Sequence, residues 1–129
     1  MATVTATQVT KKYGAFIALH SVDLEIHDGE FVVFVGPSGS GKSTLIRCIA
    51  GLEQIASGTI RIAGQDVTTV DPADRDLSMV FQNYALFPHM TCRANLEFPL
   101  KTEGLKKSEV SRRVEAAGRL LRIDSILNR

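Results

Sequence analysis

The chain has 129 residues, of which 44% are hydrophobic and 22% charged, and its formal net charge at pH 7 is +1. This length suits one domain and is too short for two, and the composition is typical of a globular protein. The balanced charge gives no electrostatic basis for binding nucleic acid, so we expect no nucleic acid partner. No apolar run approaches the roughly 20 residues that span a bilayer. Any membrane role must therefore come through a partner that spans the membrane.

The cysteines and histidines argue against two further classes of protein. Secreted domains of this size usually carry more than the two cysteines found here, which favours a reducing compartment. Cys48 lies in the apolar stretch 46–49, and we expect a small buried hydrophobe there and no reactive thiol. The three histidines lack the spacing of a metal cluster.

Two strands and a turn are predicted at the start of the chain. Residues 3–9 are rich in β-branched side chains at alternating positions, which indicates a strand. Residues 17–26 alternate from Val22 onward, which predicts a second strand with one buried face. Asp28-Gly29 then marks a turn.

A strand, a glycine-rich loop and a helix are predicted next. Residues 31–35 are apolar at every position, which is typical of a strand buried on both faces in a parallel sheet covered by helices. After the loop, residues 43–52 predict a helix, with Gly51 as its C-terminal stop. This order of elements predicts an α/β fold.

The remainder predicts a hairpin, a short strand and a helical end. Residues 59–62 and Val67 flank Ala63-Gly64-Gln65-Asp66, which indicates a small hairpin, and residues 77–81 form another short apolar strand. Beyond Pro88 the pattern becomes helical, with Ser108 as a candidate N-cap. The apolar positions of this last helix are Val110, Val114, Ala117 and Leu121.

The strongest functional signal is a nine-residue segment that matches the G-x-x-x-x-G-K-[ST] phosphate-binding pattern. It reads Gly36, Pro37, Ser38, Gly39, Ser40, Gly41, Lys42, Ser43 and Thr44. Glycines let backbone N–H groups turn inward and approach phosphate oxygens closely, and the following helix adds free N–H groups and the positive end of its dipole. Lys42 supplies a full charge to the β- and γ-phosphates, the Ser43 hydroxyl can ligate Mg²⁺, and Thr44 can contact the inner phosphates.

An ordinary glycine-rich turn is the alternative interpretation of this segment. On the order of one chain in two hundred of this length would match the four fixed positions by chance, at average residue frequencies. The motif also requires a buried strand before it and a helix after it, and the sequence predicts both. We therefore expect this loop to bind the phosphates of a nucleotide.

The loop alone does not distinguish a transport ATPase from a P-loop kinase or a GTPase, but the sequence around it does. Residues 9–14, Val-Thr-Lys-Lys-Tyr-Gly, resemble the start of the nucleotide-binding domains of ABC transporters. The resemblance implies that Tyr13 stacks on the adenine ring, as an aromatic face can do without reading the edges of the base. The alternative for Tyr13 is a half-buried aromatic at the end of a strand.

Further segments carry the same resemblance. Residues 30–45 are similar to that family throughout, as is Ile49-Ala50-Gly51-Leu52-Glu53. Met79-Val80-Phe81-Gln82 resembles the family's Q-loop, which implies that Gln82 reaches Mg²⁺ or the attacking water with its carbonyl or amide. Without the resemblance, Gln82 would be interpreted as a surface loop residue.

The segment after Gln82 narrows the resemblance to one group of transporters. Residues 83–91 resemble the ATPase subunits of bacterial importers for sugars, polyols and glycerol phosphate. In that group this segment faces the transmembrane permease subunits, and the large apolar side chains of Tyr84, Leu86 and Phe87 suit an interface. The alternative is that these side chains pack inside the helical part of the domain itself.

The resemblance implies a fold, cofactors and partners. The fold is the α/β P-loop NTPase fold of an ABC nucleotide-binding domain, with an N-terminal antiparallel β part. Residues 1–86 would belong to its core and residues 87–129 to the start of its helical subdomain. The cofactors are ATP and Mg²⁺. The implied partners are transmembrane permease subunits, a second ATP-binding subunit in a dimer and, indirectly, a solute-binding protein, which places the protein on the cytoplasmic face of the cell membrane.

Three elements of that family's domain do not occur in the sequence. These are an LSGGQ-type signature, a strand ending in Asp-Glu, and the switch histidine. Hydrolysis needs an oriented water and stabilised charge at the γ-phosphate. We therefore expect residues 1–129 alone to bind ATP without useful turnover, to be marginally stable, and to expose apolar surface. Two alternatives remain open, a non-hydrolysing nucleotide-binding module that regulates a partner and a P-loop kinase.

Overall fold

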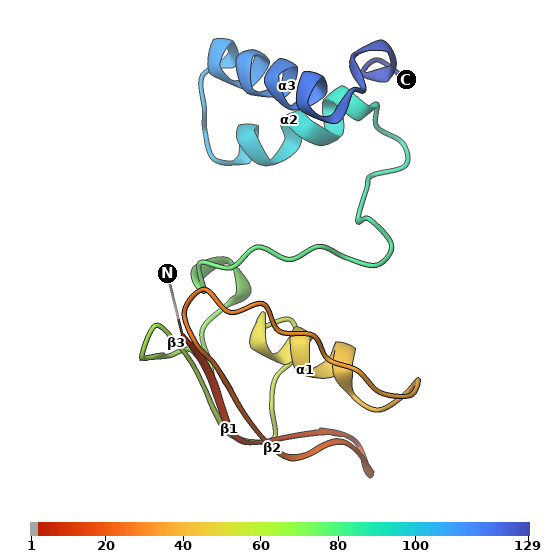
Figure 1. Cartoon of the computed structure of the whole chain (residues 1–129). Coiled ribbons are helices and arrows are strands. Elements are labelled where there is room, and N and C mark those ends of the chain that lie inside the picture. The colour runs from red at the N-terminus through yellow and green to blue at the C-terminus, as the bar shows by residue number, and fades with distance from the viewer. Residues whose placement is uncertain (1–2) are drawn as a thin grey trace. The chain divides into compact units, whose positions relative to one another are not determined.

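The computed structural model describes residues 3–129, and the chain divides into two compact units (Figure 1). The first unit ends at Met79 and the second is Val80–Arg129. Each unit has a hydrophobic core of its own.

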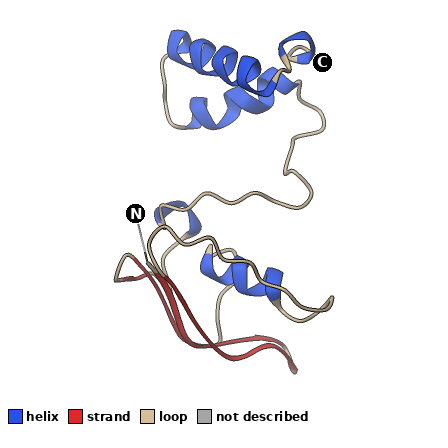
Figure 2. Cartoon of the chain, viewed as in Figure 1, coloured by secondary structure: helices blue, strands red, loops and turns tan. Residues whose placement is uncertain are grey.

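The first unit is built on a four-stranded antiparallel sheet (Figure 2). Its strands are β1 (Val4–Tyr13), β2 (Phe16–Ile26), β3 (Ser57–Ile62) and β4 (Gln65–Asp66), in the order β2-β1-β3-β4. Every neighbouring pair is antiparallel. The antiparallel start of the chain and the hairpin around Ala63-Gly64 are therefore confirmed, and β1 continues past the predicted end at Val9 to Tyr13.

Helix α1 (Lys42–Ile49) packs against the sheet and closes the first core (Figure 1). Its buried side chains, Leu45 and Cys48, join a core contributed mainly by the strands. The strand residues of this core are Ala6, Val9, Leu19, Ile60 and Ile62. Cys48 is buried as expected, and burial raises the pKa of its thiol.

The helix ends close to the predicted stop. Gly51 has φ +80°, its N–H donates to Cys48 O at 3.1 Å, and Leu52 N–H donates to Arg47 O at 2.9 Å. This pair of bonds is the Schellman motif, which favours glycine at the left-handed position. The helix begins at Lys42 and its last residue is Ile49, so it starts slightly earlier and ends earlier than the predicted 43–52.

Two of the predicted strands are wrong. Residues 31–35 and 77–81 form no strand, and within residues 3–129 no other strand pairs with them. The side chains of Phe31 and Val35 are 93% and 90% exposed, where the sequence predicts burial on both faces. An apolar segment becomes a central strand only when neighbours satisfy its backbone on both sides. The expected exposure of apolar surface is confirmed.

The second unit is a pair of helices, α2 (Cys92–Thr102) and α3 (Lys107–Leu121), followed by a short 3₁₀ turn. Val110, Val114 and Leu127 form its buried core, and four partly buried side chains pack around them. These four are Leu96, Leu100, Leu105 and Ile123. Cys92 N–H and Arg93 N–H donate to the carbonyls of Arg129 and Leu127, so the last residues of the chain close the free N-terminus of α2.

Two details of the last helix differ from prediction. The N-cap is Lys106, since Glu109 N–H and Val110 N–H both donate to its carbonyl, and Ser108 lies inside the first turn. Leu121 is 58% exposed, because the buried face follows a spacing of four and continues into Gly118. The chain then leaves the helix at Arg122, whose φ is +56°.

Candidate functional site

The glycine-rich loop lies tightly against strand β2. Gly41 is the N-cap of α1 with φ +90°, a conformation that side chains rarely adopt. A Cβ atom added to Gly41 would lie 2.8 Å from Ala18 O and 2.9 Å from Leu19 Cδ2. Only glycine therefore allows the loop to turn into the helix at this distance from β2.

Lys42 closes the loop on itself. Its ammonium donates to Gly36 O at 2.8 Å, Pro37 O at 2.7 Å and Ser40 Oγ at 3.1 Å. An ammonium has three donors, and here all three contact atoms of the loop. The positive charge is thereby held inside the curve of the loop, where the sequence motif predicts phosphate.

The start of α1 presents free backbone donors beside this charge. The first bond of the helix runs from Leu45 N–H to Gly41 O at 2.8 Å, so the N–H groups of Lys42, Ser43 and Thr44 have no acceptor within α1. The first turn contains no acidic residue. Free N–H groups and the positive dipole end together favour an anion at this position.

A pocket of about 370 Å³ joins this helix end to the hairpin between β1 and β2. Its lining contains Tyr13, Phe16 and Ala18 together with residues 39–44. The structure thus brings Tyr13 next to the glycine-rich loop. A pocket with an aromatic wall and a donor-rich floor has the chemistry to hold a planar base and an attached phosphate chain.

Sequence reasoning missed Phe16, which pairs with Tyr13 across the tight turn at Gly14-Ala15. The signal was present, since two aromatic residues separated by a two-residue turn face each other in a hairpin. Phe16 is exposed, so the mouth of the pocket has an aromatic side chain from each strand.

Sequence reasoning also missed Arg75, a buried arginine that fixes the far end of α1. Its guanidinium donates to Cys48 O at 3.0 Å, Ile49 O at 2.9 Å and Val70 O at 2.9 Å. Burial lowers the pKa of this guanidinium, and its position beside the C-terminal carbonyls suits a cation. A Cβ on Gly51 would lie 2.5 Å from Arg75 Nε. No sequence motif indicates this contact, which depends on tertiary packing.

The remaining predicted site residues belong to the second unit. Gln82 is exposed and lies in the turn at residues 82–85. Because Gln82 belongs to the second unit and Ser43 to the first, their joint role toward Mg²⁺ stays a prediction.

The loop at residues 83–91 divides into exposed and packed side chains. Tyr84 and Leu86 are exposed, whereas the Phe87 ring packs on Phe98 of α2 with 4.8 Å between ring centres. Asn95 holds this loop, since its Oδ1 accepts from Phe87 N–H at 2.8 Å and its Nδ2 donates to three carbonyls.

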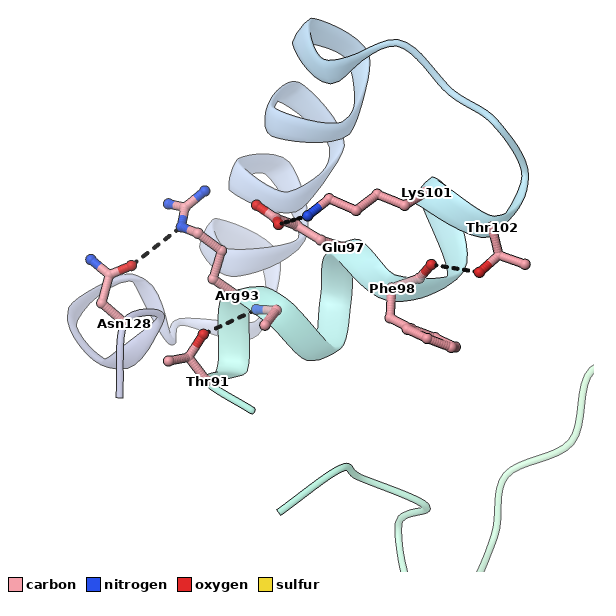
Figure 3. A network of polar contacts seen from close by, with 8 residues as sticks. Thr91, Arg93, Glu97, Phe98, Lys101, Thr102 and Asn128 are labelled. Carbon is pink, nitrogen blue, oxygen red and sulfur yellow. Dashed lines mark hydrogen bonds and ion pairs between the residues drawn. The ribbon is translucent and has the colours of Figure 1, made fainter. Parts of the chain in front are cut away.

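Helix α2 is stabilised at its start and along its surface (Figure 3). Thr91 caps the helix by accepting from Ala94 N–H at 3.1 Å. An ion pair between Glu97 and Lys101, one turn apart, supports the same helix. The C-terminal end of the segment 83–91 therefore leads directly into the ordered helix α2.

The family model described as ABC transporter matches residues 19–129. The chain belongs to the ABC transporter family. The match includes the glycine-rich loop and Gln82, and the resemblance drawn from the sequence is confirmed.

Individual relatives of this ABC transporter chain are transport proteins. It is 54% identical over all 129 residues to the sn-glycerol-3-phosphate import ATP-binding protein UgpC 3 of Rhizobium johnstonii. It is 52% identical over the same length to the lactose transport ATP-binding protein LacK of Rhizobium radiobacter. The chain spans 37% of the length of the first relative and 36% of the length of the second.

Solved structures of ATP-binding cassettes share the fold of this ABC transporter chain. A dimeric post-hydrolysis state of the cassette MJ0796 bound to ADP and Pi has a TM-score of 0.81 and 32% identity, covering 97% of the chain and 60% of the cassette. The cassette MJ1267 has a TM-score of 0.83 and 26% identity, covering 100% of the chain and 57% of that cassette. The predicted fold class is confirmed. None of the helices within residues 3–129 has the length and apolar character needed to cross a bilayer.

Proposed function

We propose that this chain binds Mg-ATP as part of an ABC import ATPase, with the phosphates held by residues 36–44 and the adenine by Tyr13. The observation that carries the proposal is the pocket lined by Tyr13, Lys42 and the other first residues of α1. It combines an aromatic wall with the three backbone donors at the start of α1, next to the loop that holds the Lys42 ammonium.

The residues present fit a nucleotide bound with magnesium. The Lys42 ammonium contacts neutral oxygens in the loop, and anionic phosphate oxygens are stronger acceptors for it. The N–H groups at the start of α1 would hold the inner phosphates, and the exposed Ser43 hydroxyl and the Gln82 carbonyl would hold the metal. Bound Mg²⁺ would neutralise charge on the β- and γ-phosphates. Tyr13 and Phe16 would orient the base.

The import role is proposed from the relatives and from the loop after Gln82. Because the named relatives serve sn-glycerol-3-phosphate import and lactose transport, we propose that ATP hydrolysis drives import of a sugar, polyol or glycerol phosphate. Permease subunits would dock at residues 83–91, where Tyr84 and Leu86 are exposed. A second ATP-binding subunit and a solute-binding protein complete the proposed assembly, at the cytoplasmic face of the membrane.

The proposal is tested by calorimetric titration of Mg-ATP into the chain and into Lys42→Ala. Lys12→Ala is the matched control, since Lys12 is an exposed lysine of β1 outside the pocket. We expect the control to bind like the unaltered chain and Lys42→Ala to lose binding. A nucleotide at 100 times its Kd should also stabilise the fold by roughly 2.7 kcal/mol. Equal affinity in Lys42→Ala would contradict the proposal.

A further inference from the structure

The lysine two residues before Tyr13 is buried and fully engaged. Lys11 is only 8% exposed, although lysines are rarely buried unless they are paired. Its Nζ lies 2.9 Å from Glu53 Oε2 and donates to Gln54 O at 2.7 Å. The same atom lies over the Tyr13 ring, 4.6 Å from its centre. One ammonium therefore contacts a carboxylate, a carbonyl and an aromatic face.

The Tyr13 ring contacts both this ammonium and the pocket. Tyr13 lines the pocket and Lys11 does not, so the ring touches the lysine and also borders the cavity. Tyr13 is 46% exposed, and a half-exposed side chain with two rotatable bonds needs a contact that selects one orientation. A cation within about 6 Å of the ring centre is attracted to the ring face, and this attraction opposes rotation of the ring.

Glu53 connects the lysine to the helix that follows the phosphate loop. It comes after the C-terminal turn of α1, and its Oε1 lies 3.6 Å from the guanidinium of Arg47 in that helix. The hydrogen bond from Lys11 lowers the pKa of Glu53, with smaller contributions from Arg47 and the Tyr13 hydroxyl. The carboxylate is thus ionised at neutral pH and joins β1 to α1.

We propose that Lys11 is a positioning residue that holds the Tyr13 ring in the orientation that accepts adenine, and that Glu53 keeps this ring in register with the phosphate-binding helix. The inference rests on the proposed function and extends it. It separates binding of the base, which depends on Lys11, from binding of the phosphates, which depends on Lys42.

The test is a double-mutant cycle measured with two ligands, Mg-ATP and Mg-tripolyphosphate. Stacking on an aromatic side chain typically strengthens the binding of a base by about fivefold or more. Lys11→Met should remove part of this contribution to the affinity for Mg-ATP. We expect Lys11→Met to weaken Mg-ATP binding by about three- to tenfold and to leave the affinity for tripolyphosphate unchanged. In a Tyr13→Leu background the same substitution should have no effect on either ligand. Lys12→Met, which removes an equal charge from the neighbouring exposed residue, is the matched control.

Each other outcome overturns a defined part of the proposal. If Lys11→Met weakens the binding of both ligands equally, Lys11 has a general structural role and the positioning role is overturned. The positioning role is also overturned if Lys11→Met weakens Mg-ATP binding as much in the Tyr13→Leu background as in the unaltered chain. If the unaltered chain binds both ligands equally, the phosphate site stands and the role of Lys11 is wrong. If the unaltered chain binds neither ligand, the proposed function itself fails.

A second measurement covers the case in which Lys11→Met does not fold. In the nuclear magnetic resonance spectrum of the unaltered chain, the ε-methylene protons of Lys11 should be shifted upfield by the Tyr13 ring current. The shift should disappear in Tyr13→Leu and remain in Lys12→Met. Lysine resonances at ordinary positions in the unaltered chain would overturn the proposal without any nucleotide present.

Discussion

The glycine-rich loop and the apolar segment just before it are adjacent in the chain, but different interactions determine their conformations. The loop takes much of its form from contacts within a few residues, namely glycine conformations and a lysine bound to its own loop, and Gly41 adds one close approach to β2. Residues 31–35 are apolar throughout, yet they form no strand. A phosphate-binding loop can thus be specified locally, whereas a central strand depends on neighbours distant in sequence.

The largest effect on stability is expected from a substitution in the glycine-rich loop. Gly41→Ala places a Cβ 2.8 Å from Ala18 O at φ +90°, so strain and overpacking should together destabilise the fold by about 3 kcal/mol. Gly29→Ala is the matched control, because Gly29 has φ +78° and a Cβ added there would have nothing within 4 Å, and it should cost only about 1 kcal/mol. Urea denaturation measures both. Equal costs would show that contact with β2 does not constrain the loop.

The second-largest effect on stability is expected at Arg75, which is distant in sequence from the loop and from α1. Arg75→Met removes the buried donor to the C-terminal carbonyls of α1, which should destabilise the fold by about 2 kcal/mol. Arg61→Met on the exposed side of β3 should change stability by less than about 0.5 kcal/mol. Thermal unfolding compares the two variants. If Arg75→Met leaves the stability unchanged, the loop and α1 do not depend on this contact for their stability.

A smaller effect is expected in α3, where Glu109 forms ion pairs with residues within one turn of the same helix. Arg112 and Arg113 donate to Glu109 and lower the pKa of its carboxyl to about 2. A lowered pKa contributes stability above the ordinary value of 4.5 that is lost as pH falls toward about 2. Helicity measured by circular dichroism should therefore decline in this window, and less so in Glu109→Gln. An identical decline in both proteins would show that Glu109 is not its cause.

The smallest effect on stability is expected in the apolar segment. Phe31→Ser and Val35→Thr alter exposed side chains, so each should change the free energy of unfolding by less than about 0.5 kcal/mol. Both should reduce self-association, because exposed apolar groups promote it. Light scattering against concentration measures this effect. A large loss of stability would show that the segment is packed in solution.

The sequence predicted what local chemistry determines. Strands β1 and β2, the helix after the loop and its stop at Gly51 follow from alternation, helix spacing and glycine conformation. The pocket beside Tyr13 is lined by that residue and by residues 39–44 of the motif, and their roles toward a nucleotide stay predictions.

What the sequence did not predict depends on distant partners. The wrong strands at 31–35 and 77–81 share an apolar pattern whose outcome depends on pairing. Arg75 was missed because its guanidinium donates to four carbonyls in two segments distant from each other in sequence, 48–49 and 68–70. Ser108 was favoured as a cap by residue type, but the backbone starts the helix at the residue after Lys106.

The buried thiol of Cys48 makes the motion of α1 chemically observable. Cys48 lies on the buried face of the helix that follows the loop, while Cys92 is only half-buried in the second unit. An alkylating reagent should therefore modify Cys92 first and reach Cys48 only when α1 leaves the sheet. The labelling rate at Cys48 counts these openings, with Cys92 as an internal reference. A ligand that holds the start of α1 should slow that rate, so alkylation of Cys48 reports whether the ligand is bound.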